Sequence, residues 1–185
     1  MNTDKICIFT DTGKMHTIKA VDIPLGRFRD KGTPVDNLSN YDSSQERMLY
    51  VAPVGQLRSD RLLFVTKTSM CKLVEGAEFD VAKRTIASTK LADEDELIFI
   101  GSASEMEQIV LQSHGGCFLR FLTQEVSTMK KTALGVRGMK LADDDYLEHA
   151  YLLAGHQEYT ISYHDKEYAL NKVRLAKRDT KGIKP

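Results

Sequence analysis

Four similar units follow one another along this chain, and that repetition restricts the fold to a repeat architecture. Each unit opens with an apolar run, and the runs follow at a spacing of about 50 residues, as in solenoids and propellers. They read KICIFT from Lys5, RLLFVTK from Arg61, EQIVLQS from Glu107 and YTISYH from Tyr159. Val, Ile, Phe and Thr, which are abundant in these runs, favour strands. The repeat is therefore expected to be a β-repeat.

A second apolar run follows each first run after a short turn. The turns are Asp11-Thr12-Gly13, Lys67-Thr68, His114-Gly115-Gly116 and His164-Asp165-Lys166, and the second runs read KMHTIKA, SMCKLVE, CFLRFLT and EYALNKV. Glycine and aspartate tolerate the positive φ angles that tight hairpin turns require. The pattern predicts that every unit opens with a β-hairpin.

Two further strands are expected in each complete unit. Third strands are predicted over Thr33 to Leu38, Ile86 to Leu91 and Ala133 to Leu141, and fourth strands over MLYVAPV from Met48, ELIFIGS from Glu96 and YLEHAYLLAG from Tyr146. Four short antiparallel strands per unit are typical of a propeller blade. The prediction is one all-β, propeller-like domain over residues 1–185, with repeats at 4–54, 61–103, 107–155 and 159–185. The fourth repeat supplies only its hairpin and the following connection, and an array that ends in mid-repeat leaves strand edges unpaired, so we expect a fragment.

Charges take fixed places in these units. The formal net charge is +0, which taken alone disfavours a nucleic-acid partner. However, the connection after each second strand is basic, and acidic turns follow the third strands, ADEDE from Ala92 and ADDD from Ala142. In a ring of repeats, the two signs would lie on different rims. A neutral protein can then present a positive stripe.

Membrane, disulfide and metal chemistry are not indicated. No apolar run approaches the roughly 20 residues that span a bilayer, and no signal-peptide pattern opens the chain, so we expect a cytoplasmic protein. Cys7, Cys71 and Cys117 are odd in number and lie in predicted strands, so we interpret them as buried thiols. The five histidines, His16, His114, His149, His156 and His164, lack the spacing of metal ligands.

No catalytic residue or cofactor is expected either. The acidic turns lack the loop spacing of calcium sites, and we interpret them as solvated turns. Gly135-Val136-Arg137-Gly138 leads into a predicted strand, whereas a phosphate-binding glycine loop opens a helix.

The repeats resemble a known family. IFTDTGKMHTIKAVDIPLGRFRDKGTPVDNL and KKTALGVRGMKLADDD are similar to repeats of the carboxy-terminal domain of the A subunit of bacterial DNA gyrase and of its paralogue in topoisomerase IV. The resemblance covers nearly the whole chain. It implies a β-pinwheel, a propeller-like ring of about five or six blades that binds and bends duplex DNA around a basic perimeter.

The resemblance also implies which residues bind DNA. Arg29, Arg84, Lys131 and Arg178 occupy the basic place after the second strand, and the first of them needs a one-residue gap in the alignment. Flanking them are Arg27, Lys31, Lys83, Lys130, Arg137, Lys140, Lys177 and Lys181. All would contact phosphates. The implied partners are duplex DNA, the ATPase subunit of the holoenzyme and the rest of the topoisomerase A subunit, while the catalytic tyrosine lies in another domain.

The sequence departs from the gyrase repeats at one motif, and a second function is also compatible with it. The gyrase branch carries a Gln-Arg-Arg-Gly-Gly-Lys-Gly box, whereas Lys177-Arg178-Asp179-Thr180-Lys181-Gly182 has Asp and Thr where glycines would stand, so the paralogue is left open. Without the resemblance, a repeat scaffold that binds proteins would rank first, because fold does not fix function.

Overall fold

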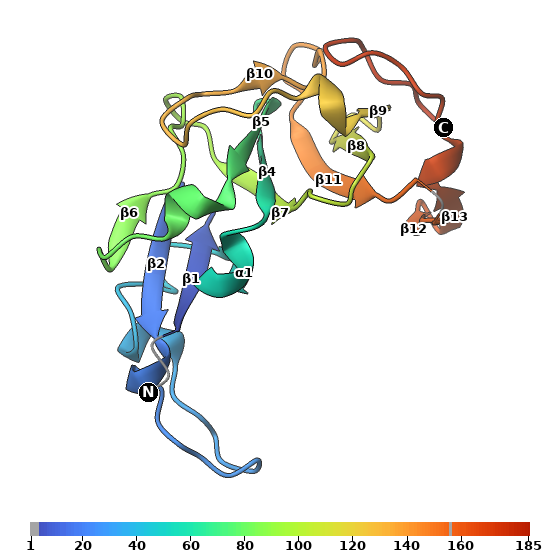
Figure 1. Ribbon diagram of the computed structural model, residues 1–185. Helices are drawn as coiled ribbons and strands as arrows, with labels where there is room; N and C mark the ends of the chain where they lie inside the picture. Colours follow the sequence, from blue (N-terminus) through green and yellow to red (C-terminus); the bar gives the residue numbers. More distant parts are fainter. Residues whose placement is uncertain (1–3, 156) are drawn as a thin grey trace.

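A computed structural model describes residues 4–155 and 157–185 and shows an all-β chain arranged as an arc of successive sheets (Figure 1). The strands are β1 (Lys5–Thr10), β2 (Lys14–Lys19), β3 (Met48–Pro53), β4 (Arg61–Thr66), β5 (Met70–Glu75), β6 (Thr85–Ala87), β7 (Leu97–Ser102), β8 (Gln108–Ser113), β9 (Phe118–Leu122), β10 (Val136–Arg137), β11 (Leu147–Leu153), β12 (Thr160–Tyr163) and β13 (Lys166–Ala169). The predicted all-β, propeller-like class is thus confirmed.

Short helical turns punctuate the strands. One α-helical turn, α1 (Val54–Leu57), links the first two repeats, and the 3-10 helices are η1 (Ala20–Asp22), η2 (Val35–Asn37), η3 (Gly76–Phe79), η4 (Thr123–Glu125) and η5 (Leu170–Lys172). Four of these 3-10 helices begin directly after a second strand, so every hairpin is followed by the same turn.

The sheets are antiparallel, and their strand order shows an exchange between repeats. The orders are β3-β1-β2-β6, β10-β5-β4-β7, β11-β8-β9 and β12-β13. β6 comes from the second repeat but pairs with β2 of the first, and β10 comes from the third repeat but pairs with β5 of the second. The prediction that each repeat supplies all four strands of its own blade was therefore wrong. A local pattern specifies a strand but not which neighbour it pairs with.

The predicted third strands were also too long. Ladder pairing is confined to Thr85–Ala87 and Val136–Arg137. Beyond these residues, contact with the preceding repeat continues as single hydrogen bonds, such as those from the Ser88 and Gly138 N–H groups to the Gly13 and Ser69 carbonyl oxygens. In the third sheet, the corresponding place is taken by a single antiparallel bridge between Phe118 and Ile183.

The predicted strand over Thr33 to Leu38 is not formed. Thr33 and Pro34 lie in a loop, and the next residues form η2. Pro34 has no backbone N–H for a ladder, and none of the sheets formed by the described residues includes this segment.

The hydrophobic core is divided into clusters between successive sheets. β4 is apolar on both faces: Leu62 and Phe64 pack toward the first sheet, and Leu63 and Val65 pack toward the third. A further buried apolar cluster, which includes Val110, joins the third sheet to the fourth. Each sheet is thus stabilised by burial against its neighbours, as in other repeat proteins.

Candidate nucleic-acid interface

Three of the four basic connections, those that follow β5, β9 and β13, are held along the edge of the preceding sheet. The connection that follows β9 runs parallel to β5 at Thr128 and Leu73, and the one that follows β13 runs parallel to β9 at Leu175 and Arg120. Each connection then passes a glycine close to the strand. A Cβ added to Gly135 would lie 2.7 Å from the Cys71 carbonyl oxygen, and one added to Gly182 would lie 2.8 Å from that of Phe118.

Two of the predicted phosphate ligands, Lys131 and Arg178, make equivalent contacts inside the protein, each with a glutamate of the preceding repeat. The Lys131 N–H donates to Glu78 Oε2 at 3.2 Å, and Lys131 Nζ donates to the Glu78 carbonyl oxygen at 3.0 Å. In the next repeat, the Arg178 N–H donates to Glu125 Oε2 at 3.0 Å, and Arg178 Nε donates to the Glu125 carbonyl oxygen at 3.1 Å. We call these two contact pairs the latches, because each ties a connection to the 3-10 helix of the preceding repeat.

Three more residues of the predicted set have acidic partners. Arg84 Nη2 lies 3.5 Å from Asp22 Oδ2, and Lys130 Nζ lies 3.4 Å from Glu78 Oε1. Arg137 Nε donates to Asp179 Oδ1 at 2.5 Å, and Arg137 Nη2 donates to Asp179 Oδ2 at 3.1 Å. The hydrogen bond from Arg137 lowers the pKa of Asp179, and the same hydrogen bond raises the pKa of Arg137. These pairs are partly exposed, so each contributes little to stability.

The remaining seven predicted residues are exposed and unpaired. Across the described ranges, no hydrogen bond or ion pair is formed by the side chains of Arg27, Arg29, Lys31, Lys83, Lys140, Lys177 and Lys181. We call these seven residues the free basic set. Every one of the four connections contributes at least one member.

The sequence-based prediction missed one further lysine, Lys90. Lys90-Leu91-Ala92-Asp93 repeats the tetrapeptide Lys140-Leu141-Ala142-Asp143, so Lys90 is the second-repeat counterpart of Lys140. Lys90 is exposed as well. The identical tetrapeptide is the signal that would have found it.

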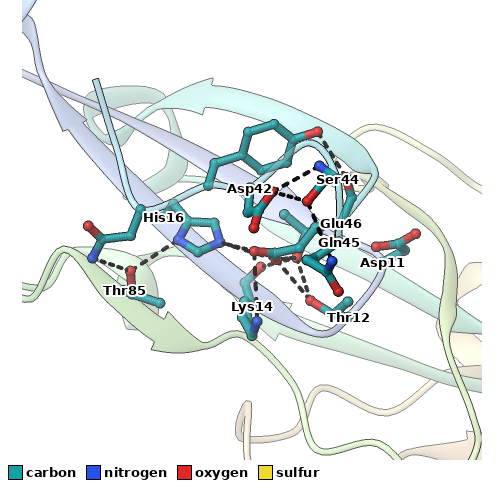
Figure 2. A network of polar contacts seen from close by, with 12 residues as sticks. Asp11, Thr12, Lys14, His16, Asp42, Ser44, Gln45, Glu46 and Thr85 are labelled. Atoms are coloured by element: carbon teal, nitrogen blue, oxygen red, sulfur yellow. Dashed lines mark hydrogen bonds and ion pairs between the residues drawn. The ribbon is translucent and has the colours of Figure 1, made fainter. Parts of the chain in front are cut away.

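A carboxylate in the turn before the first repeat's last strand contacts the first hairpin. Figure 2 shows the carboxylate of Glu46 facing the first hairpin turn. Glu46 is 7 % exposed and accepts hydrogen bonds from Thr10 Oγ1 at 2.7 Å and Thr12 Oγ1 at 2.9 Å, with His16 Nε2 at 3.1 Å. Burial by itself would raise the pKa of Glu46, but the hydrogen bonds outweigh it and the pKa is lowered. The ionised carboxylate therefore locks the hairpin turn.

Equivalent locks occur in the next two repeats. Asp95 accepts from the Thr68 N–H at 3.0 Å and from Thr68 Oγ1 at 2.6 Å, and Asp145 accepts from the Gly115 N–H at 2.9 Å. Each of the three acids lies two residues before the first residue of a fourth strand. The interpretation of ADEDE and ADDD as solvated turns was thus wrong for one carboxylate in each, Asp95 and Asp145.

A buried lysine lies at the junction of the second and third repeats. Lys72 is 1 % exposed, and its Nζ donates to the carbonyl oxygens of Lys131 and Ala133 at 2.7 and 2.6 Å. Burial lowers the pKa of Lys72 to about 8. Lys72 occupies an inward position of β5. Nothing in the sequence distinguished this lysine from those at the surface.

The three cysteines are free thiols that differ in burial. Cys7 and Cys71 are buried free thiols, as interpreted, whereas Cys117 is half-buried. The described part of the chain contains no group of three or more His, Cys, Asp or Glu side chains arranged to hold a metal ion, and His156 lies outside it. Within the same residues, no helix is long and apolar enough to cross a membrane.

Comparison with known proteins gives consistent matches. The family described as "DNA gyrase C-terminal domain, beta-propeller" matches residues 4–43, 60–104 and 107–154. The A subunit of DNA gyrase from Ureaplasma parvum is 27 % identical over 96 % of this chain and 22 % of that protein, and the A subunit of DNA topoisomerase 4 from Bacillus subtilis is 30 % identical over 78 % and 18 %. The chain thus spans about a fifth of the length of these relatives.

Solved structures share the fold. A crystal structure of the C-terminal domain of DNA topoisomerase IV superposes with a TM-score of 0.88 at 24 % identity, covering 98 % of this chain and 58 % of that one. A DNA gyrase A C-terminal domain superposes with a TM-score of 0.73 at 22 % identity, covering 99 % and 60 %.

Proposed function

Because this chain belongs to the DNA gyrase C-terminal domain family, we propose that it binds duplex DNA without sequence preference and bends it. The observation that carries this proposal is the free basic set, which draws unpaired cationic side chains from all four connections. The connections lie on successive sheets of an arc (Figure 1). Cations placed along a curved surface can follow the phosphates of a bent duplex.

The proposed mechanism is electrostatic. Each phosphate that a lysine or arginine neutralises releases condensed counterions, and this release makes affinity depend on salt but not on sequence. Smooth bending of a 20 to 30 base-pair site costs about 1 to 6 kcal/mol, so several contacts must act together. In this assignment, the free basic set and Lys90 contact phosphates, while Lys131 and Arg178 hold the connections in place.

We further propose that this chain occupies the same position in a longer protein as the matching segments occupy in the relatives. The chain would serve as the non-catalytic carboxy-terminal domain in the A subunit of a bacterial type II topoisomerase, where its partners would be the other domains of the same polypeptide and the ATPase subunit. Strand passage would take place in the other domains, and this domain would act in the cytoplasm at the nucleoid.

A protein-binding scaffold is the second candidate. Five of the predicted basic residues contact acidic residues within the chain, which makes part of the surface mixed in sign. The side chains of Leu25 and Phe28 are fully exposed, at 105 % and 106 %. Such apolar exposure favours a protein contact at that one loop.

A matched pair of double variants tests the DNA-binding surface. Lys90→Glu/Lys140→Glu reverses two repeat-equivalent positions, and Lys19→Glu/Lys166→Glu makes the same charge change at exposed lysines outside the basic connections. In a fluorescence-anisotropy titration of linear duplex, we expect the first variant to lose about two units of the slope of log affinity against log salt. The control should keep most of the wild-type slope. Equal slopes in the two variants would contradict the assigned surface.

A further inference from the structure

A cavity of about 590 Å³ lies at the junction between the second and third sheets. Its walls come from the start of β4, from β5, from the residues just before β8, and from the segment that leads from the end of β9 through η4 into the next connection. All of its lining residues lie between Arg61 and Thr128, so the cavity belongs to the interior of the array. Cavities that bind small molecules measure about 300 to 1,000 Å³.

A recurring hydrogen bond aligns this second junction with the first one. The Gly76 N–H donates to the Asp60 carbonyl oxygen, and the Thr123 N–H donates to the Glu107 carbonyl oxygen, both at 2.8 Å. Gly76 and Thr123 each begin the 3-10 helix that follows a second strand. Residues counted from these two positions are therefore equivalent, and the two junctions can be compared side chain by side chain.

In the first junction, a carboxylate lies between two cations. Asp80 follows Gly76 by four residues. Its Oδ1 lies 3.7 Å from Lys5 Nζ, and its Oδ2 lies 2.9 Å from Arg58 Nη2. The residue before it, Phe79, is 1 % exposed and fills the space beneath with an aromatic ring.

The second junction keeps a cation but lacks the carboxylate. Arg61 is the first residue of its hairpin, as Lys5 is, whereas Ser127 stands at the position of Asp80. With the residues that the structure describes, the Arg61 side chain forms no hydrogen bond or ion pair. The smaller Val126 stands at the position of the aromatic ring and lines the cavity. The cavity therefore lies where the first junction has a ring and a carboxylate.

A buried hydroxyl also lines the cavity without a partner. Thr123 is 6 % exposed, and its Oγ1 has no hydrogen-bond partner among the described residues. Buried hydroxyl groups in folded proteins are normally hydrogen-bonded. Ser127 and Thr128 add two further hydroxyls to the same wall. The cavity thus offers one guanidinium and several hydroxyl donors to an acceptor.

We propose that this cavity binds a small organic carboxylate, which supplies the group that Asp80 supplies within the first junction. Arg61 pairs with the carboxylate, because a guanidinium fits a carboxylate with two parallel hydrogen bonds. Thr123 donates its hydroxyl, and the apolar part of the ligand contacts Leu73 and Val126. The site is separate from the proposed DNA-binding surface, since no member of the free basic set lines the cavity.

One acidic residue of the cavity wall sets the charge that the ligand can carry. Glu107 is exposed, and its carboxylate lies against Gly155. The negative charge of Glu107 opposes an anion in the cavity but would attract an ammonium group. Glu107→Gln should therefore strengthen the binding of a carboxylate. Weaker binding in this variant would overturn the assignment of the ligand as a simple anion.

An amide NMR titration with 3-phenylpropionate tests the site. This probe carries a ring and a carboxylate, as Phe79 and Asp80 together do. We expect saturable shifts at the amides of Thr123, Ser127 and Thr128, and none with the neutral analogue 3-phenylpropanamide. Equal shifts with both compounds, or no saturable shift with the carboxylate up to about 10 mM, would overturn the proposal.

Three variants assign the contact to its residues. Arg61→Gln should weaken binding by about tenfold or more, because it removes a charged hydrogen-bond donor. The matched control Lys5→Gln changes the equivalent position of the first junction and should leave the affinity unchanged. Ser127→Asp should abolish binding, because it gives the second junction the internal carboxylate of the first.

The same amide spectra show that each variant is folded. Arg61→Gln removes no contact with the described residues, so it keeps the test decisive even where Ser127→Asp disturbs the fold. Wild-type affinity in Arg61→Gln, wild-type affinity in a folded Ser127→Asp, or an equal loss in Lys5→Gln would overturn the assigned site.

Discussion

At the scale of single residues, the same side-chain type has different roles according to its surroundings. Lys72 is buried between two carbonyl oxygens, whereas Lys140 is exposed and unpaired. Glu46 is buried and ionised against the first hairpin, whereas Glu94 in the next acidic turn is exposed. Charge by itself therefore does not assign a residue to binding or to stability.

Lys72 should make stability depend on pH. Its pKa falls from 10.5 to about 8 on folding, so between these values the unfolded chain binds more protons and the free energy of unfolding rises with pH. The rise should amount to at most about 3 kcal/mol. Chemical denaturation of wild type and Lys72→Met at pH 7 to 10.5 measures it. The difference between the two proteins cancels the opposing effect of the buried thiols, whose pKa values burial raises. A difference that does not change with pH would contradict the lowered pKa.

At the scale of elements, the connection after each hairpin joins one repeat to the next. It begins with a 3-10 helix and, from the second repeat on, runs along the second strand of the preceding repeat. In the second and third repeats it supplies the outermost strand of that sheet. The latches at Lys131 and Arg178 fix its position. These basic residues are therefore expected to affect stability more than DNA affinity.

Arg178 and its neighbour Lys177 provide a matched test of that expectation. Arg178→Ala removes donors to the carbonyl oxygens of Glu125 and Arg137, and the loss should destabilise the junction by about 1 to 3 kcal/mol. Hydrogen exchange at the paired amides of Phe118 and Ile183 reports the opening of this junction directly. Lys177→Ala should change the exchange by less than about 0.5 kcal/mol, as for other surface substitutions. Similar effects of both substitutions would contradict the latch.

The sequence predicts the hairpins well because their signals are local. Turn residues and apolar runs lie within one short segment, and β1, β2, β4, β5, β8 and β9 follow the predicted ranges to within about two residues. The exchange of β6 and β10 could not be predicted, because the partner strand lies in another repeat. For the same reason, the sequence could not show which basic residues are held in latches and which are free. Glu78 and Glu125 are remote in sequence from the residues that they hold.

At the scale of the whole molecule, the protein is an arc of sheets with a core cluster at each junction. An exchanged strand crosses each of the first two junctions, and a latch crosses each of the last two. Neighbouring sheets are thus held together by apolar burial and by a ladder, a latch or both. This arrangement fixes the relative positions of the three basic connections that follow β5, β9 and β13. A curved and rigid array of cations is what bending of a stiff duplex requires.

Affinity for linear duplex DNA measured across a salt series tests this account most directly. Two duplexes of equal length and unrelated sequence are titrated with the wild-type chain from about 50 to 200 mM salt, the range over which phosphate contacts lose most affinity. We predict a steep linear fall of log affinity with log salt, at the same slope for both sequences. The absence of binding at the lowest salt, or binding that is independent of salt, would contradict the proposed function.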